Sequence, residues 1–129
     1  MDKRDYYKYL FIIGAIWNWA ASLPFILIVL TNPNMLLAFG LDVPPSLIWV
    51  QIFLACVFLF GIGYFLVGRE IEDNHAVALI GALAKIVVFI AFVYYFAIGD
   101  VPLFLVLLGT GDLIFAILFL EFLVNFDKL

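Results

Sequence analysis

The chain has 129 residues, of which 68% are hydrophobic, 19% are aromatic and 12% are charged. Soluble domains are about 45–50% apolar and about one quarter charged, so this composition excludes an ordinary soluble domain and indicates a membrane protein. The formal net charge of −4 argues against nucleic acid as a partner, because phosphate binding requires a basic surface.

Four apolar stretches are long enough to cross a bilayer, which takes about 20 mainly apolar residues in a helix. They cover residues 7–30, 46–68, 76–98 and 102–124. The connections between them are short, and short connections favour neighbouring helices that run in opposite directions. We therefore predict an all-α fold, a single domain over residues 1–129 that forms an integral membrane four-helix antiparallel bundle.

Proline and polar residues mark the ends of these stretches. Asn32-Pro33-Asn34 is predicted to stop the first helix, and Pro44-Pro45-Ser46 is predicted to begin the second. Asp100, two residues before Pro102, is expected to cap the fourth helix. In the longest connection we expect residues 35–39, which are followed by Gly40, to form a short helix at the membrane interface.

The distribution of lysine and arginine between the loops predicts the orientation. Loops 31–45 and 99–101 contain neither residue. With four spans, the cationic segments all fall on the opposite side, and their residues are Lys3, Arg4, Lys8, Arg69 and Lys128. We therefore expect a multi-pass protein of the cell membrane with both termini in the cytoplasm.

Three of the spans carry one polar residue each near their middle: Asn18, Lys85 and Asp112. At a rise of about 1.5 Å per residue, Lys85 lies roughly 13 Å deep and Asp112 roughly 15 Å deep in a core of about 30 Å. Ionisable groups at this depth cost about 2.5–3.5 kcal/mol each and are candidates for function. Small residues share their helix faces, which indicates inward packing. We predict a Lys85–Asp112 ion pair within hydrogen-bonding reach of Asn18.

The role of this pair has two interpretations. It can fix which helices meet and in what register, or it can handle a proton, an ion or a ligand. Trp17 and Trp19 flank Asn18, where they can wall a flat hydrophobic ligand or fill space in the bundle. Gln51, near the outer end of the second span, can line a vestibule or lie near the headgroups. The candidate ligand or ion-pair residues are Asn18, Lys85, Asp112, Trp17, Trp19 and Gln51.

Two segments carry a resemblance to a known family. Gly81-Ala82-Leu83-Ala84-Lys85 and Gly111-Asp112-Leu113-Ile114-Phe115-Ala116, together with four spans and cytoplasmic termini, resemble the DoxX-like superfamily of small bacterial and archaeal membrane proteins. The resemblance is architectural and covers most of the chain. Some members are membrane subunits linked to quinone reduction. This chain has no redox centre of its own, so we expect no built-in cofactor, and electron transfer would need a bound quinone and a partner. The resemblance carries over no catalytic residue.

No complete catalytic constellation is evident, and three functions stay open. The first is an accessory or scaffolding subunit associated with quinone or lipid. The second is a proton- or ion-coupled small-molecule carrier acting as a dimer, with Asp112 as the protonation site. The third is a membrane enzyme acting on a lipid or isoprenoid substrate. With one cysteine and one histidine we expect no metal, and quinone is the only cofactor that we consider. The expected partners are membrane lipids and a second copy or a larger membrane complex.

Overall fold

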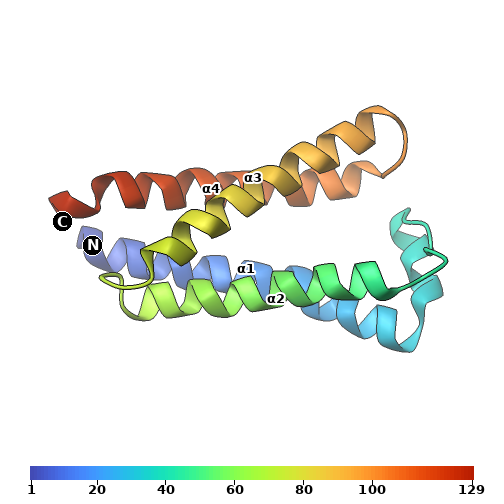
Figure 1. The fold of residues 1–129 in the computed structure, drawn as a ribbon, viewed down its shortest axis with the longest axis horizontal. Helices are drawn as coiled ribbons and strands as arrows, with labels where there is room; N and C mark the ends of the chain where they lie inside the picture. The colour runs from blue at the N-terminus through green and yellow to red at the C-terminus, as the bar shows by residue number, and fades with distance from the viewer.

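The computed structural model describes all 129 residues, and it contains helices but no β-strands. The four long helices are α1 (Lys3–Thr31), α2 (Ile48–Arg69), α3 (His75–Ala97) and α4 (Leu103–Asn125), and two 3₁₀ helices, η1 (Pro33–Phe39) and η2 (Phe126–Lys128), complete the fold (Figure 1). All four long helices are long and apolar enough to cross a membrane. The four predicted spans are therefore confirmed, and the chain has the build of a multi-pass membrane protein.

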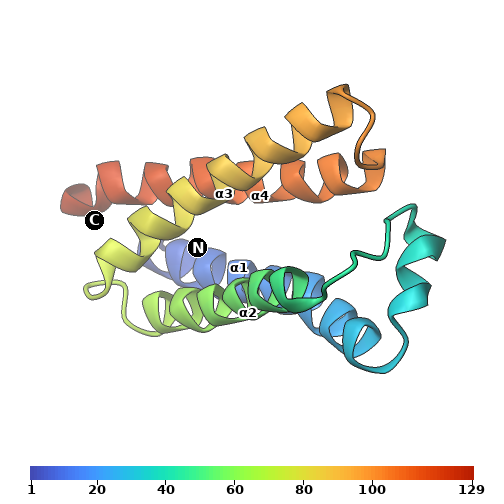
Figure 2. The same ribbon diagram turned by 45° about the vertical axis from the view of Figure 1, so that its right-hand side comes forward.

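The helices pack mainly as two pairs, α1 with α2 and α3 with α4. The two pairs touch chiefly through α2 and α3, with fewer contacts between α1 and α4. In both views α3 starts beside the end of α2 and then diverges from it along its length (Figures 1 and 2). Both chain termini lie at the end of the molecule opposite η1 (Figure 1). The two pairs are therefore close at the terminal end and spread apart toward η1.

Two of the predicted helix boundaries are wrong. Helix α2 begins at Ile48 rather than at Ser46, with Leu47 as its N-cap residue. Helix α4 begins at Leu103 with Pro102 as its N-cap residue, so Asp100 does not cap it. The expected short helix is present as η1, and Gly40 ends it with a φ of 77°, a left-handed conformation that glycine adopts without strain.

Aromatic rings fill the interior between the pairs near the terminal end. The Phe11 ring on α1 stacks on Phe119 of α4 at a centroid distance of 4.4 Å and meets Phe122 edge-on at 5.0 Å. All three side chains are fully buried. Large apolar side chains are exposed on the outside of every long helix, among them Leu27, Leu59, Val87 and Val124. This outward apolar surface is the one that a lipid-facing bundle needs.

The terminal end is tied together by polar contacts. Arg4 forms an ion pair with Glu72 in the loop between α2 and α3. The Tyr7 hydroxyl donates a hydrogen bond of 2.9 Å to Glu121 on α4. These contacts lie near the ends of the helices, where charged side chains reach headgroups and water at low cost.

The contact between α1 and α2 depends on a glycine. A Cβ atom on Gly68 would lie 2.9 Å from the carbonyl oxygen of Lys8, a backbone atom that cannot move aside. We expect Gly68→Ala to lower the free energy of unfolding by about 1–3 kcal/mol, the usual cost of overpacking. Gly63→Ala on the same helix is the control, because its Cβ would meet only a side-chain methyl group of Val77. Denaturant titration in mixed micelles measures both, and equal losses would contradict this packing.

Candidate functional site

The two charged residues of the interior form an ion pair. Lys85 Nζ on α3 lies 2.7 Å from Asp112 Oδ1 on α4, and the two side chains are 5% and 20% exposed. Lys85 also donates a hydrogen bond of 2.8 Å to Asn18 Oδ1 on α1. The contacts expected from the depth of these residues are therefore present, and they connect three helices.

Trp17 completes this group. Its indole Nε1 donates a hydrogen bond of 3.0 Å to Asp112 Oδ1, the same oxygen that faces Lys85. The ring lies directly against Gly111, where a Cβ atom would collide with it. The sequence suggested a wall or a space-filling role for Trp17, but it did not reveal a donor to the carboxylate. We call Trp17, Asn18, Lys85 and Asp112 the polar cluster.

The polar cluster also contacts α2, the one long helix that contributes no residue to it. Asn18 Nδ2 donates a hydrogen bond of 2.9 Å to the backbone carbonyl of Val57 on α2. The Lys85 ammonium lies 5.3 Å from the ring centre of Tyr64 on α2 and 5.6 Å from that of Phe115 on α4, distances that suit cation–π attraction. Tyr64 was missed at the level of sequence. Its signal is Gly81 on α3, which leaves room for the tyrosine ring.

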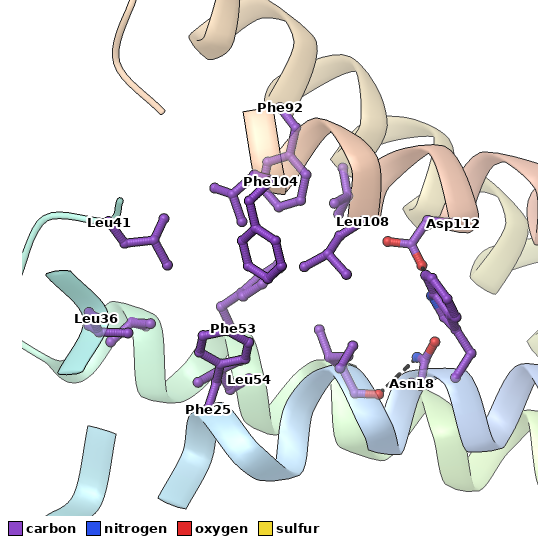
Figure 3. Close-up of a pocket in the computed structure, with 16 residues that line it drawn as sticks. Asn18, Phe25, Leu36, Leu41, Phe53, Leu54, Phe92, Phe104, Leu108 and Asp112 are labelled. Atoms are coloured by element: carbon purple, nitrogen blue, oxygen red, sulfur yellow. Dashed lines mark hydrogen bonds between the residues drawn. The ribbon is translucent and has the colours of Figure 1, made fainter. Parts of the chain in front are cut away.

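A first cavity of about 250 Å³ extends from the polar cluster toward η1 (Figure 3). Of the 16 residues that line it, 14 are hydrophobic. Asn18 and Asp112 lie at one end, and Leu36 and Leu41, from η1 and the segment after it, lie at the other (Figure 3). Trp17, which is hydrogen-bonded to Asp112, also lines the cavity. The cavity is therefore an apolar chamber with a polar floor.

Aromatic rings gather at the η1 end of this chamber. Phe25 and Phe104 line the cavity, and Phe39 of η1 packs on both, at ring-centre distances of 5.1 Å and 5.7 Å. The connection between α1 and α2 thereby covers part of the chamber.

A second cavity, of about 170 Å³, lies where α2 and α3 diverge. Its lining includes Tyr64, Lys85 and Cys56, and it shares Asn18 and Asp112 with the first cavity. Cys56 is exposed on the outer surface of α2, so this cavity reaches the surface that faces lipid in a membrane. The polar cluster therefore lies where the two cavities adjoin, and the second cavity forms a lateral opening beside it.

Two residues that the sequence singled out lie apart from the cluster. Trp19 donates a hydrogen bond of 3.3 Å to the carbonyl of Phe58, packs against Gly61 on α2 and lines neither cavity. Gln51 is exposed on α2, makes no side-chain hydrogen bond and also lines neither cavity. Trp19 thus joins α1 to α2, and the structure brings together only Trp17, Asn18, Lys85 and Asp112.

The remaining titratable side chains do not form a metal site. No group of three or more histidine, cysteine, aspartate and glutamate side chains is close enough to hold an ion. The His75 Nε2 atom is hydrogen-bonded to the carbonyl oxygen of Ile71 at 2.6 Å. The His75 ring also packs on the ring of Phe126, with the two ring centres 4.4 Å apart. The chemistry available inside the bundle is therefore that of one ammonium, one carboxylate and their hydrogen-bonding neighbours.

Comparisons with protein-family models, with curated proteins and with solved structures found no match to this chain. The structure alone therefore indicates what kind of protein this is. The chain is a small all-α protein with four membrane-length apolar helices and a charged cluster between two cavities.

Removing one charge of the ion pair leaves the other unpaired in an apolar interior. We expect Asp112→Leu to lower the free energy of unfolding by about 3–5 kcal/mol. The double variant Lys85→Met/Asp112→Leu should regain most of that loss, because it removes both buried charges. Unfolding titrations of the single and double variants in the same micelles measure the difference. A double variant as unstable as the single one would show that the unpaired charge of Lys85 does not cause the loss of stability.

Cys56 lines the second cavity together with the polar side chains of Asn18, Lys85 and Asp112, whereas a cysteine at position 59 would lie on the lipid-facing surface outside it. The nucleophile is the thiolate, and a cavity lined by polar groups supports it better than hydrocarbon does. We expect N-ethylmaleimide to alkylate Cys56 about tenfold faster than a cysteine at Leu59, tested as Cys56→Ser/Leu59→Cys in bilayers. Leu59 lies about one helical turn away and outside the cavity. Equal rates, followed by mass spectrometry, would show that no such opening exists.

Proposed function

We propose that the protein is an integral membrane accessory subunit that binds an amphipathic, membrane-soluble molecule of the quinone or lipid class in the first cavity. The observation that carries this proposal is the apolar chamber of about 250 Å³ that ends on the polar cluster. Ligand sites combine mostly apolar walls with a few placed polar groups, which is the composition of this chamber. The chamber is somewhat smaller than the usual 300–1,000 Å³, so a long ligand would extend beyond it.

The proposed orientation is an antiparallel bundle in the cell membrane with both termini in the cytoplasm. Its support is the positive-inside bias of the loops together with the position of both termini at one end of the molecule (Figure 1). In this orientation η1 and the chamber lie toward the outer side of the membrane. A ligand could then arrive from the outer leaflet or through the lateral opening.

The proposal of a quinone rests on the DoxX-like resemblance, because some members of that family are linked to quinone reduction. The chain itself contributes no redox group, so it would hold or present the quinone while a partner subunit supplies electrons. Membrane lipids, or a second copy of the chain, would cover the exposed apolar faces of the helices.

A proton- or ion-coupled carrier is the second candidate, and one observation favours it. Asp112 and Asn18 line both cavities near the middle of their helices, and transporter sites lie near the midplane of the bilayer. Four helices are few for such a pathway, so this function calls for a dimer. Proteoliposomes separate the two candidates, because a carrier shows pH-linked flux and a binding subunit does not. An enzyme that uses Asp112 and Lys85 as acid and base ranks third, since no group of metal ligands lies beside them.

A larger side chain inside the first cavity should weaken binding of the proposed ligand. Ala21 lines the first cavity, and Ala20 beside it is exposed on the outside of the same helix. We expect Ala21→Phe to weaken binding by at least about tenfold, because the added ring occupies the ligand's volume. Ala20→Phe adds the same ring to the outer surface and should leave binding unchanged.

The readout is the fluorescence of Trp17 in a Trp19→Phe/Trp49→Phe background, where it is the single indole. Decylubiquinone and bromodecanol serve as quenching probes in nanodiscs. Saturable quenching by either probe that Ala21→Phe weakens supports the proposed function. Quenching by both probes that does not saturate, and that is the same in all variants, would overturn it.

A further inference from the structure

At the floor of the first cavity, a single side-chain nitrogen or oxygen has no hydrogen-bond partner. Three of the residues that line this cavity carry a polar group in the side chain: Trp17, Asn18 and Asp112. The indole N–H of Trp17 is donated to Asp112 Oδ1. Both ends of the Asn18 amide are engaged, since Oδ1 accepts from Lys85 and Nδ2 donates to the Val57 carbonyl. What remains free is the second carboxylate oxygen of Asp112.

The free oxygen of Asp112 is accessible from the cavity. Both protein donors to this carboxylate, Lys85 and Trp17, bind Oδ1, and none binds Oδ2. Every fully buried side-chain nitrogen or oxygen has a partner, so Oδ2, which has none, is not fully buried. Figure 3 shows one carboxylate oxygen of Asp112 pointing into the chamber. A carboxylate oxygen has lone pairs for further donors, so this atom calls for a donor from the ligand.

The charge of the polar cluster restricts the ligand further. The Lys85 ammonium and the Asp112 carboxylate balance each other at 2.7 Å. A ligand carboxylate would add an uncompensated negative charge beside Asp112, and a ligand ammonium would leave an extra positive charge in an apolar chamber. A neutral head without a donor, such as an ether, an ester or a ketone, would present only lone pairs to the carboxylate oxygen. A hydroxyl group is neutral and is a donor.

We propose that the first cavity selects a neutral amphiphile with a hydroxyl head, a long-chain alcohol whose O–H donates to Asp112 Oδ2 while its apolar chain extends along the chamber toward Phe104 and η1. This inference rests on the proposed function and narrows it. Of the quinone and lipid classes proposed for this cavity it selects a lipid with a hydroxyl head, because a quinone presents only carbonyl oxygens. It adds that the head group of the ligand donates a hydrogen bond and that Asp112 accepts it.

A matched set of ten-carbon compounds tests this selection. The compounds are n-decanol, decyl methyl ether, decanoate and decylamine, and each competes with bromodecanol for quenching of Trp17 in the Trp19→Phe/Trp49→Phe protein in nanodiscs. Concentrations are referred to the membrane phase, because the compounds partition differently. We expect n-decanol to compete about tenfold more strongly than the ether, the size of effect that a hydrogen bond to a charged group gives. Decanoate and decylamine should also compete more weakly than the alcohol.

The variant Lys85→Gln/Asp112→Asn tests whether the charged pair recognises the hydroxyl group of the ligand. It keeps polar side chains of similar shape and removes both charges, so the preference for alcohol over ether should fall toward one. If this variant does not fold, the ratio measured on the unmodified protein still decides the question.

The outcomes separate this inference from the proposed function. Equal competition by alcohol and ether, with both weakened by Ala21→Phe, would overturn hydroxyl selection and leave the binding cavity intact. Stronger competition by decanoate would overturn it as well. Competition by none of the four compounds, together with no saturable quenching by bromodecanol or decylubiquinone, would overturn both proposals.

Discussion

The structure depends on one buried ion pair. Lys85 and Asp112 place opposite charges 2.7 Å apart in a bundle whose other buried side chains are mainly apolar and aromatic. Each charge alone would cost about 2.5–3.5 kcal/mol at the middle of a membrane. An arrangement of α3 and α4 that separates the two charges is therefore unfavourable. Asn18 and Trp17 extend the same constraint to α1, and the bond from Asn18 to the Val57 carbonyl extends it to α2. One polar cluster thus sets the register of all four helices.

The same constraint creates the two cavities. Helix α3 diverges from α2 away from the terminal end (Figure 1), and Lys85 and Asp112 line the second cavity between these helices, while aromatic rings pack the interior at the terminal end. Asp112 is 20% exposed for this reason, although Lys85 is only 5% exposed. A pair that served only to hold the helices together could be sealed on every side. This pair has free space on two sides, and that difference supports a ligand-binding role.

The sequence predicted those features that follow from the helical repeat. Hydropathy located the four spans, depth along each helix matched Lys85 with Asp112, and the small residues beside them marked the buried faces. It could not predict how each helix is rotated or how α3 diverges from α2, because both depend on packing across the whole bundle. The Trp17 bond to Asp112, the place of Tyr64 over Gly81 and the cavities all depend on these angles. Gln51 and Trp19 were included for their residue type and depth, and rotation of their helices puts them outside the cluster. Asp100 failed as a cap because Pro102 fixes the start of α4.

The central claim is that Lys85 and Asp112 are in direct contact inside a lipid bilayer. Solid-state NMR on protein reconstituted in bilayers, with ¹⁵N at lysine Nζ and ¹³C at aspartate Cγ, measures that contact through the dipolar coupling between the two nuclei. Lys85 is assigned by its loss in Lys85→Met. The account predicts a strong coupling for this lysine, consistent with an Nζ–Oδ1 separation of 2.7 Å. No measurable coupling between Lys85 and any aspartate would contradict it, because the helix register, the polar floor of the chamber and the proposed site all require this pair.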